Sequence, residues 1–92
     1  MLSQIPIDLK KVDKKNINKE ILRLGMIAEL DAVSLYEQLA AYTTSKKIKK
    51  VLLDIAREEK THIAEFQTLL HEIDKEQVEE NKKGKKKVNN LS

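Results

Sequence analysis

The sequence predicts an all-α protein built around an antiparallel hairpin of two long helices. Two observations favour this fold class. Apolar residues recur at helical spacing along two long stretches, and glycine, proline and aromatic residues are too scarce for a turn-rich β protein. The chain has 92 residues, of which 40% are hydrophobic and 36% are charged, so we expect one small folded domain rather than a disordered chain.

The first helix is predicted to begin between Asp13 and Asn18 and to end at about Tyr42. Asp13, Asn16 and Asn18 are each suited to cap its N-terminus. Its apolar stripe consists of Ile21, Gly25, Ala28, Ala32, Leu35 and Leu39. The residues before this helix have a mixed pattern and carry the only proline, so residues 1–15 are expected to form an irregular N-terminal arm.

The second helix is predicted to begin after Thr44 or Ser45, either of which can cap it, and to end at about Ile73. Because the connection between the two helices is short, they must be antiparallel neighbours. A lone hairpin cannot cover its own apolar faces in water. We therefore expect two copies of it to dimerise into a four-helix bundle.

The C-terminal part of the chain is expected to add little to this hairpin. Residues 74–81 could form a short third helix capped by Asp74. The helical domain is accordingly placed at residues 16–80, and the lysine-rich residues 81–92 are expected to form a basic flexible tail or linker.

Composition excludes several classes of function. The absence of cysteine excludes disulfides, thiolate zinc sites, a rubredoxin-type iron site and a cysteine nucleophile, and it is compatible with a reducing cytoplasm. No apolar run approaches the roughly 20 residues of a membrane span, and the N-terminus lacks the order of a signal peptide. The lysine clusters at 46–50 and 82–87 are expected to be solvated, and without aromatic or glycine-rich patterns they give little support for a nucleic-acid partner.

Two polar residues lie within the apolar stripe of the second predicted helix. Glu59 and His62 are three residues apart and share a face with Leu52, Ile55, Ile63, Phe66 and Leu70. In the first predicted helix, Glu29 also lies on the inward stripe. An unpaired buried carboxylate is costly, and a metal ion would remove this cost by making all three side chains its ligands.

The number of ligands predicts a site shared between two subunits. A di-iron carboxylate bundle uses a glutamate from each of two helices and a Glu-x-x-His motif from each of the other two. This chain carries one helix of each kind, so a twofold axis would complete the bundle and the metal site together. Ligands of this mixture suit iron or manganese, and zinc is also compatible.

Other polar residues allow more than one interpretation. Tyr36 follows Glu29 by two helical turns and could donate a hydrogen bond to a ligand carboxylate, or it could be an interface tyrosine with a solvated hydroxyl. His71 is expected to be a surface histidine. Asp31 and Glu65 are expected to be solvated, or to line a path by which ions reach the site.

The two helical stretches together resemble the encapsulated ferritins of the ferritin-like superfamily. The segments ILRLGMIAELDAVSLYEQLA and VLLDIAREEKTHIAEFQTLL look very like the two metal-bearing helices of that family. The Glu29–Tyr36 and Glu59–His62 spacings match, as does the separation between the two motifs. The chain is most similar to the ferritin-like domain fused ahead of the shell protein in some archaeal encapsulins, where a segment like LHEIDKEQVEE also follows.

This resemblance implies a ferroxidase, which oxidises Fe(II) to Fe(III) at a di-iron centre shared between two subunits. Its metal ligands would be Glu29, Glu59 and His62, with Tyr36 as the nearby tyrosine, and Asp31 is the only candidate for an ion-attracting position. The resemblance also implies a homodimer that assembles into a larger ring, as in the family's decamers. The ring would associate with an encapsulin shell protein, as cargo or as a fused domain, and store iron inside that cytoplasmic nanocompartment.

Two alternatives come from other classes of function. A rubrerythrin-like di-iron peroxidase would use the same ligands but needs an electron donor, which a chain without cysteine does not supply through a rubredoxin-type site. A non-catalytic helical adaptor would use Glu59 and His62 only as a buried hydrogen-bonded pair. Iron content after aerobic Fe(II) loading separates the adaptor from both enzymes.

Overall fold

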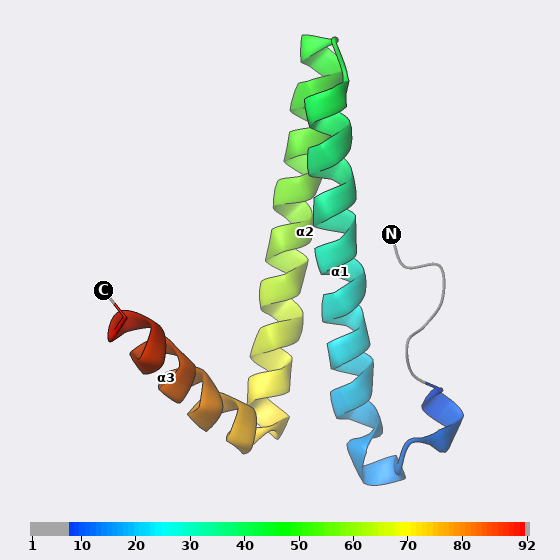
Figure 1. Cartoon of the computed structure of the whole chain (residues 1–92). Coiled ribbons are helices and arrows are strands. Elements are labelled where there is room, and N and C mark those ends of the chain that lie inside the picture. The colour runs from blue at the N-terminus through cyan, green and yellow to red at the C-terminus, as the bar shows by residue number, and fades with distance from the viewer. Residues whose placement is uncertain (1–7, 92) are drawn as a thin grey trace.

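The structure, a computed structural model, describes residues 8–91, which form helices joined by short connections and contain no strand (Figure 1). Two short 3-10 turns, η1 (Leu9–Lys11) and η2 (Lys14–Asn16), lead into helices α1 (Ile17–Tyr42), α2 (Lys46–Ile73) and α3 (Lys75–Asn89). Helices α1 and α2 run antiparallel side by side, and α3 leaves the far end of α2 at an angle. The predicted fold class is confirmed. Part of the arm expected at residues 1–15 lies outside the described residues, and the rest holds the two 3-10 turns.

Local capping accounts for most of the helix boundaries. The Ser45 hydroxyl accepts a hydrogen bond from the backbone N–H of Ile48 at 3.2 Å, so it caps α2 as expected. At the start of α1, Asn16 occupies the cap position but its side chain makes no capping bond. Asp13 instead caps η2 by accepting from the N–H of Lys15. The chain therefore enters α1 through a 3-10 turn, which provides a hydrogen-bond partner for the N–H at the start of α1.

Helix α3 is longer than the sequence indicated. It was expected to end near residue 81, but it continues to Asn89 through the lysine-rich segment. Two ion pairs, each between residues one helical turn apart, support this extension: Lys82–Glu79 at 3.4 Å and Lys83–Glu80 at 3.2 Å. Lysines in the last turn also interact favourably with the negative end of the helix dipole. The expected basic tail thus begins inside a helix, while the division of the chain into arm, hairpin domain and basic segment stays a prediction.

Asp74 forms the joint between α2 and α3. Its carboxylate accepts a hydrogen bond from the N–H of Gln77, which caps α3, and an ion pair from Arg23 of α1 at 3.1 Å. Only 7% of this residue is exposed. The hydrogen bond from Gln77, with the positive charges of Lys19 and Arg23, lowers the pKa of Asp74. This residue therefore ties all three helices together at one end of the hairpin.

The hairpin leaves much of its apolar surface uncovered. Among residues 8–91, the only buried apolar side chains are those of Ala40, Ala56 and Leu70. Large apolar side chains remain exposed along all three helices and just after α3: Ile21, Leu30, Leu39, Tyr42, Ile48, Val51, Leu53, Leu69, Ile73, Val88 and Leu91. Within that same range, no helix combines the length and the apolar character that a membrane crossing requires. Such a chain has too little interior to be stable alone and calls for a partner surface.

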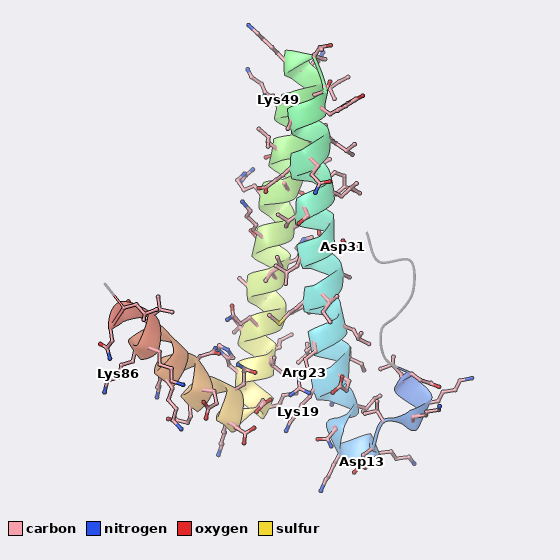
Figure 2. All side chains as sticks on the ribbon, viewed as in Figure 1. Asp13, Lys19, Arg23, Asp31, Lys49 and Lys86 are labelled. Atoms are coloured by element: carbon pink, nitrogen blue, oxygen red, sulfur yellow. The ribbon has the colours of Figure 1, made fainter. Side chains whose placement is uncertain are left out.

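The two lysine clusters lie at separate ends of the molecule. Figure 2 shows Lys49 near the tip of the hairpin and Lys86 near the C-terminal end of α3. Their lysines are exposed, as the sequence predicted. The metal-ligand candidates lie between these ends, in the middle of the hairpin.

Candidate metal centre

Helix α1 contributes one carboxylate to the seam of the hairpin. The side chain of Glu29 is only 21% exposed. Its Oε2 atom is buried and has no hydrogen-bond partner among the described residues. A buried carboxylate oxygen without a donor is costly unless a cation compensates it, so this atom marks a position where an ion would be stabilised.

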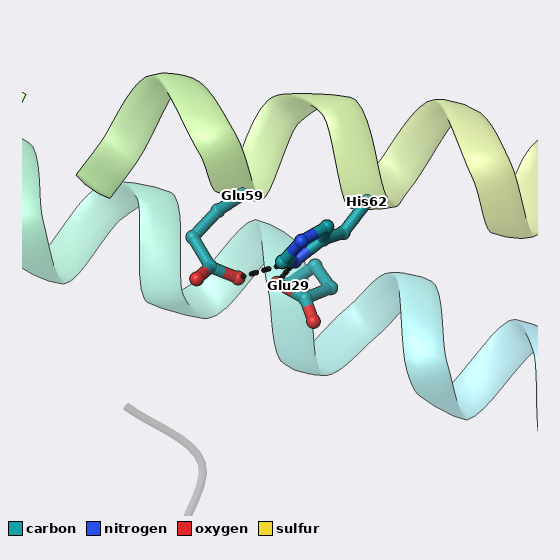
Figure 3. Close-up of side chains that lie close together, drawn as sticks. All are labelled: Glu29, Glu59 and His62. Atoms are coloured by element: carbon teal, nitrogen blue, oxygen red, sulfur yellow. Dashed lines mark ion pairs between the residues drawn. The ribbon is translucent and has the colours of Figure 1, made fainter. Parts of the chain in front are cut away.

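Helix α2 contributes a carboxylate and an imidazole from the facing side of the seam. Glu59 and His62 are three residues apart, so both point towards Glu29, as Figure 3 shows. The Nδ1 atom of His62 lies 3.4 Å from Glu59 Oε2 and 3.5 Å from Glu29 Oε2. The structure therefore brings together the three side chains that the sequence singled out.

These distances fit a shared ion better than a set of hydrogen bonds. At 3.4–3.5 Å, the contacts of His62 are long for hydrogen bonds. All three potential ligand atoms lie within 4.8 Å of one another. Two ligand atoms that each lie about 2.1 Å from one ion are separated by roughly 3–4 Å. A small decrease in the distances between the three ligand atoms would therefore let all of them bind one metal ion.

One chain supplies three ligand groups to a metal and leaves at least one coordination position open. Two carboxylates and one imidazole give three ligand groups, whereas even a tetrahedral metal takes four. The side chain of His62 is 46% exposed, against 19% for Glu59. The cluster is thus closed on the hairpin side and open on the side that faces away from it.

Tyr36 lies on α1, two turns beyond Glu29 on the same face, and is half-buried. Seven residues of helix rise about 10 Å, so two helical turns separate the backbone of Tyr36 from that of Glu29. A hydrogen bond from Tyr36 to a ligand carboxylate stays a prediction.

Three other polar residues can be compared with their expected positions. Glu65 is exposed, as predicted. Asp31 is half-buried, and its part in an ion path stays a prediction. His71, expected at the surface, is also half-buried, and the side-chain amide of Asn81 on α3 lies 2.8 Å from its Nε2 atom. Asn81 also accepts a hydrogen bond from Gln77, and no sequence pattern linked these α3 residues to His71.

An ion pair between the helices lies beside the cluster and was not anticipated from the sequence. Lys60, which follows Glu59, pairs with Glu37 of α1 at 3.0 Å. Both side chains are about half exposed, so the pair contributes on the order of 0–1 kcal/mol. It is one of the contacts that join α1 to α2.

Comparisons with known proteins cover the whole candidate centre. The sequence model of a protein family described as Rubrerythrin matches residues 20–91. A ferritin-like-encapsulin shell fusion protein from Pyrococcus furiosus is 55% identical over 73 residues, which cover 79% of this chain and 21% of that protein. The chain thus spans about a fifth of that relative's length. The crystal structure of an encapsulated ferritin domain from Pyrococcus furiosus aligns with a TM-score of 0.85 and 47% identity, over 100% of this chain and 94% of that one.

Proposed function

Because the chain belongs to the rubrerythrin family of ferritin-like domains, we propose that it is a ferroxidase that oxidises Fe(II) to Fe(III). The observation that carries this proposal is the cluster of Glu29, Glu59 and His62, in which the buried Oε2 atom of Glu29 accepts no hydrogen bond from the described residues. Ferritin-like di-iron proteins hold iron with this combination of glutamates and Glu-x-x-His motifs. The helical hairpin and its family support iron chemistry in general, and the ferroxidase reaction is our specific proposal.

The proposed site is shared between two copies of the chain. Each copy offers two carboxylates and one imidazole, so a twofold dimer offers four carboxylates and two imidazoles, enough for two iron ions. The open side of the cluster and the exposed apolar residues on the same hairpin, such as Ile21 and Leu39, support a partner surface there. In this arrangement Glu29 bridges between the subunits.

The ligands would favour oxidation because of their charge. Each Fe(II) ion loses one electron to oxygen or peroxide. Hard, anionic carboxylate oxygens from Glu29 and Glu59 stabilise the more highly charged Fe(III) product over Fe(II). His62 supplies a nitrogen ligand and fixes the orientation of the site, and we assign to Tyr36 a hydrogen bond to a ligand carboxylate of the partner subunit.

We further propose that the dimers assemble into a larger ring, most simply a decamer, for iron storage. A second apolar surface supports such contacts. It is an open groove between the hairpin and α3, about 490 Å³ in volume, with Met26, Ile27, Leu30 and Leu70 among its lining residues. An open hairpin cannot enclose a mineral, so storage needs a surrounding shell. The fusion of a relative to an encapsulin shell protein supports association with such a shell, as cargo or as a fused domain, within a cytoplasmic nanocompartment.

The rubrerythrin match also favours a second candidate, a di-iron peroxidase that uses the same ligands. A peroxidase reduces hydrogen peroxide to water with two electrons from an external donor. The two enzymes differ in what limits turnover: the ferroxidase consumes Fe(II) itself, whereas the peroxidase needs a continuous electron supply.

Iron loading of the purified chain tests the proposal. Fe(II) added in air should produce a fast rise in ferric absorbance and leave about one ferroxidase iron bound per chain. A map of anomalous scattering from Fe(II)-soaked crystals should place that iron between Glu29, Glu59 and His62. Turnover of peroxide only with an added electron donor would support the peroxidase instead. A dimer that binds no iron would leave the helical adaptor as the remaining interpretation.

A further inference from the structure

We propose that Gly25 and Phe66 are positioning residues, which set the approach of α1 to α2 one helical turn from the metal ligands. This inference rests on the proposed metal site and assigns a role to two apolar residues that supply no ligand atom. It is carried by the position of the Phe66 ring, whose end occupies the space that a Cβ atom at Gly25 would need.

The end of the Phe66 ring lies next to the position that a Cβ atom at Gly25 would take. A methyl group at Gly25 would lie 3.0 Å from Cζ of Phe66 and 3.1 Å from each of its Cε atoms. Ordinary van der Waals contacts of this kind are 3.4–4 Å long. Any residue larger than glycine at this position would therefore have to displace the ring or the helix that carries it.

The backbone does not require a glycine at position 25. This residue lies in the middle of α1, and among residues 8–91 no residue has a positive φ. Glycine weakens a helix interior relative to alanine, because it loses more conformational freedom on folding. The Phe66 ring occupies the space that a larger residue would need, which explains why glycine stands here although it lowers the stability of the helix.

The position of this contact links it to the candidate metal centre. Gly25 precedes Glu29 by four residues and Phe66 follows His62 by four, so each lies on the ligand-bearing face of its helix, one turn away. The ring therefore forms the layer of the seam adjacent to the cluster. Because packed side chains transmit displacement instead of absorbing it, the spacing of this layer sets the spacing of the ligands.

The expected effect of a substitution follows from the distances. Gly25→Ala would force the Phe66 ring to give way by a few tenths of an ångström. In a well-formed metal site the metal–ligand distances lie within about 0.2 Å of their usual values, so a shift of a few tenths of an ångström that reaches the ligands would matter. We expect the affinity for Co(II), a redox-inert probe under these conditions, to fall about tenfold, as for other groups that orient metal ligands.

Co(II) titration of the full chain, monitored by visible absorption, tests this inference. Gly84→Ala is the matched control, because a methyl group at Gly84 on α3 meets nothing within 4 Å. Gly25→Ala should weaken binding and alter the Co(II) spectrum, whereas Gly84→Ala should do neither. In the double variant Gly25→Ala/Phe66→Leu, the shorter leucine leaves room for the new methyl group and should restore most of the affinity.

The outcomes separate this inference from the proposed function. If the wild type binds no Co(II), or binds it equally well with Glu59→Ala, the metal site itself is wrong. If the wild type binds Co(II) through that site and Gly25→Ala binds it with unchanged affinity and spectrum, only the positioning role is overturned. Should Gly25→Ala fail to fold by circular dichroism, recovery of folding and binding in the double variant supports the role, and no recovery contradicts it.

Discussion

Glu29 and His62 meet across the seam between α1 and α2, with 3.5 Å between Oε2 of the carboxylate and Nδ1 of the imidazole. They belong to different helices, so their proximity depends on the register of the hairpin. Glu59 lies at a similar distance from the same imidazole nitrogen. One nitrogen thus faces two carboxylates at distances too long for good hydrogen bonds, an arrangement suited to a cation placed among them.

Removal of any one ligand should abolish most of the activity. Glu29→Ala, Glu59→Ala or His62→Ala should each reduce the initial rate of Fe(II) oxidation in air to below about a tenth of the wild-type rate, because a twofold site loses that ligand in both halves. Stopped-flow absorbance of the ferric product gives the rate. His71→Ala is the control, since His71 contacts Asn81 away from the cluster, and its rate should stay near wild type.

Tyr36→Phe should have a smaller effect than loss of a ligand. It removes only the hydroxyl and keeps the ring, so the packing of α1 is retained. If the hydroxyl orients a carboxylate of the partner subunit, Fe(II) oxidation should slow by roughly tenfold while Co(II) still binds. The oxidation rate and the Co(II) affinity, measured on one preparation of the variant, together show whether the hydroxyl takes part in the reaction. An unchanged oxidation rate would leave Tyr36 as an interface residue with no part in the reaction.

Metal should promote assembly of the chain. Without metal, the four carboxylates of a twofold site would face one another, and this repulsion opposes association. A bound cation removes the repulsion and stabilises the assembled state by mass action. Light scattering should therefore show dimers and larger rings increasing with Zn(II) or Co(II). The double variant Glu59→Ala/His62→Ala should lose this response while circular dichroism shows intact helices. A wild-type size distribution that does not change when metal is added would contradict the coupling between metal binding and assembly.

Acid should weaken the joint between α2 and α3 through Asp74. The pKa of Asp74 is lowered in the folded chain, chiefly by the N–H of Gln77. Its contribution to stability is therefore complete above its ordinary pKa of about 3.9 and is lost as the pH falls through the lower folded value. Urea unfolding at fixed protein concentration should show Asp74→Asn to be less stable than wild type at pH 7, with a difference that shrinks below about pH 4.

Asp54→Asn provides a contrast to the Asp74 variant. The pKa of Asp54 is also lowered, by a hydrogen bond from Arg57, but this pair is exposed and lies within one helix. Its loss should change stability little at any pH. Equal effects of the two substitutions would mean that the contact between Arg23 and Asp74 does not fasten the joint.

Leu70 should carry more of the hairpin's stability than any exposed leucine. It is 4% exposed, at the point where α2 contacts α1 beside the joint. Leu70→Ala should lower the free energy of unfolding by about 2–5 kcal/mol, the usual range for a buried leucine. Leu53 is 45% exposed, and Leu53→Ala should cost well under about 1 kcal/mol. Thermal or urea unfolding of the two variants under the same conditions makes the comparison.

Features that depend on neighbouring residues could be predicted from the sequence. The ends of the two long helices at Tyr42 and Ile73 were anticipated, and Ser45 was one of the two expected caps, because helical periodicity and capping act within one or two turns. The spacing of Glu59 and His62 was likewise sufficient to predict that they share one face of their helix. The extent of α3 was missed because ion pairs and dipole interactions outweighed the composition of its lysine-rich segment.

Tertiary structure decided everything that depends on the register of one helix against another. Periodicity predicts on which face of its own helix a residue lies, but not which residues of a neighbouring helix lie opposite it. The distance between Glu29 and His62, the contact of Phe66 with Gly25 and the ion pair between Arg23 and Asp74 therefore appeared only in the folded hairpin. The proximity of His71 to Asn81 is of the same kind, because the bend at Asp74 sets the direction of α3. Short-range energies select the helices, and the packing of side chains between them selects which residues meet.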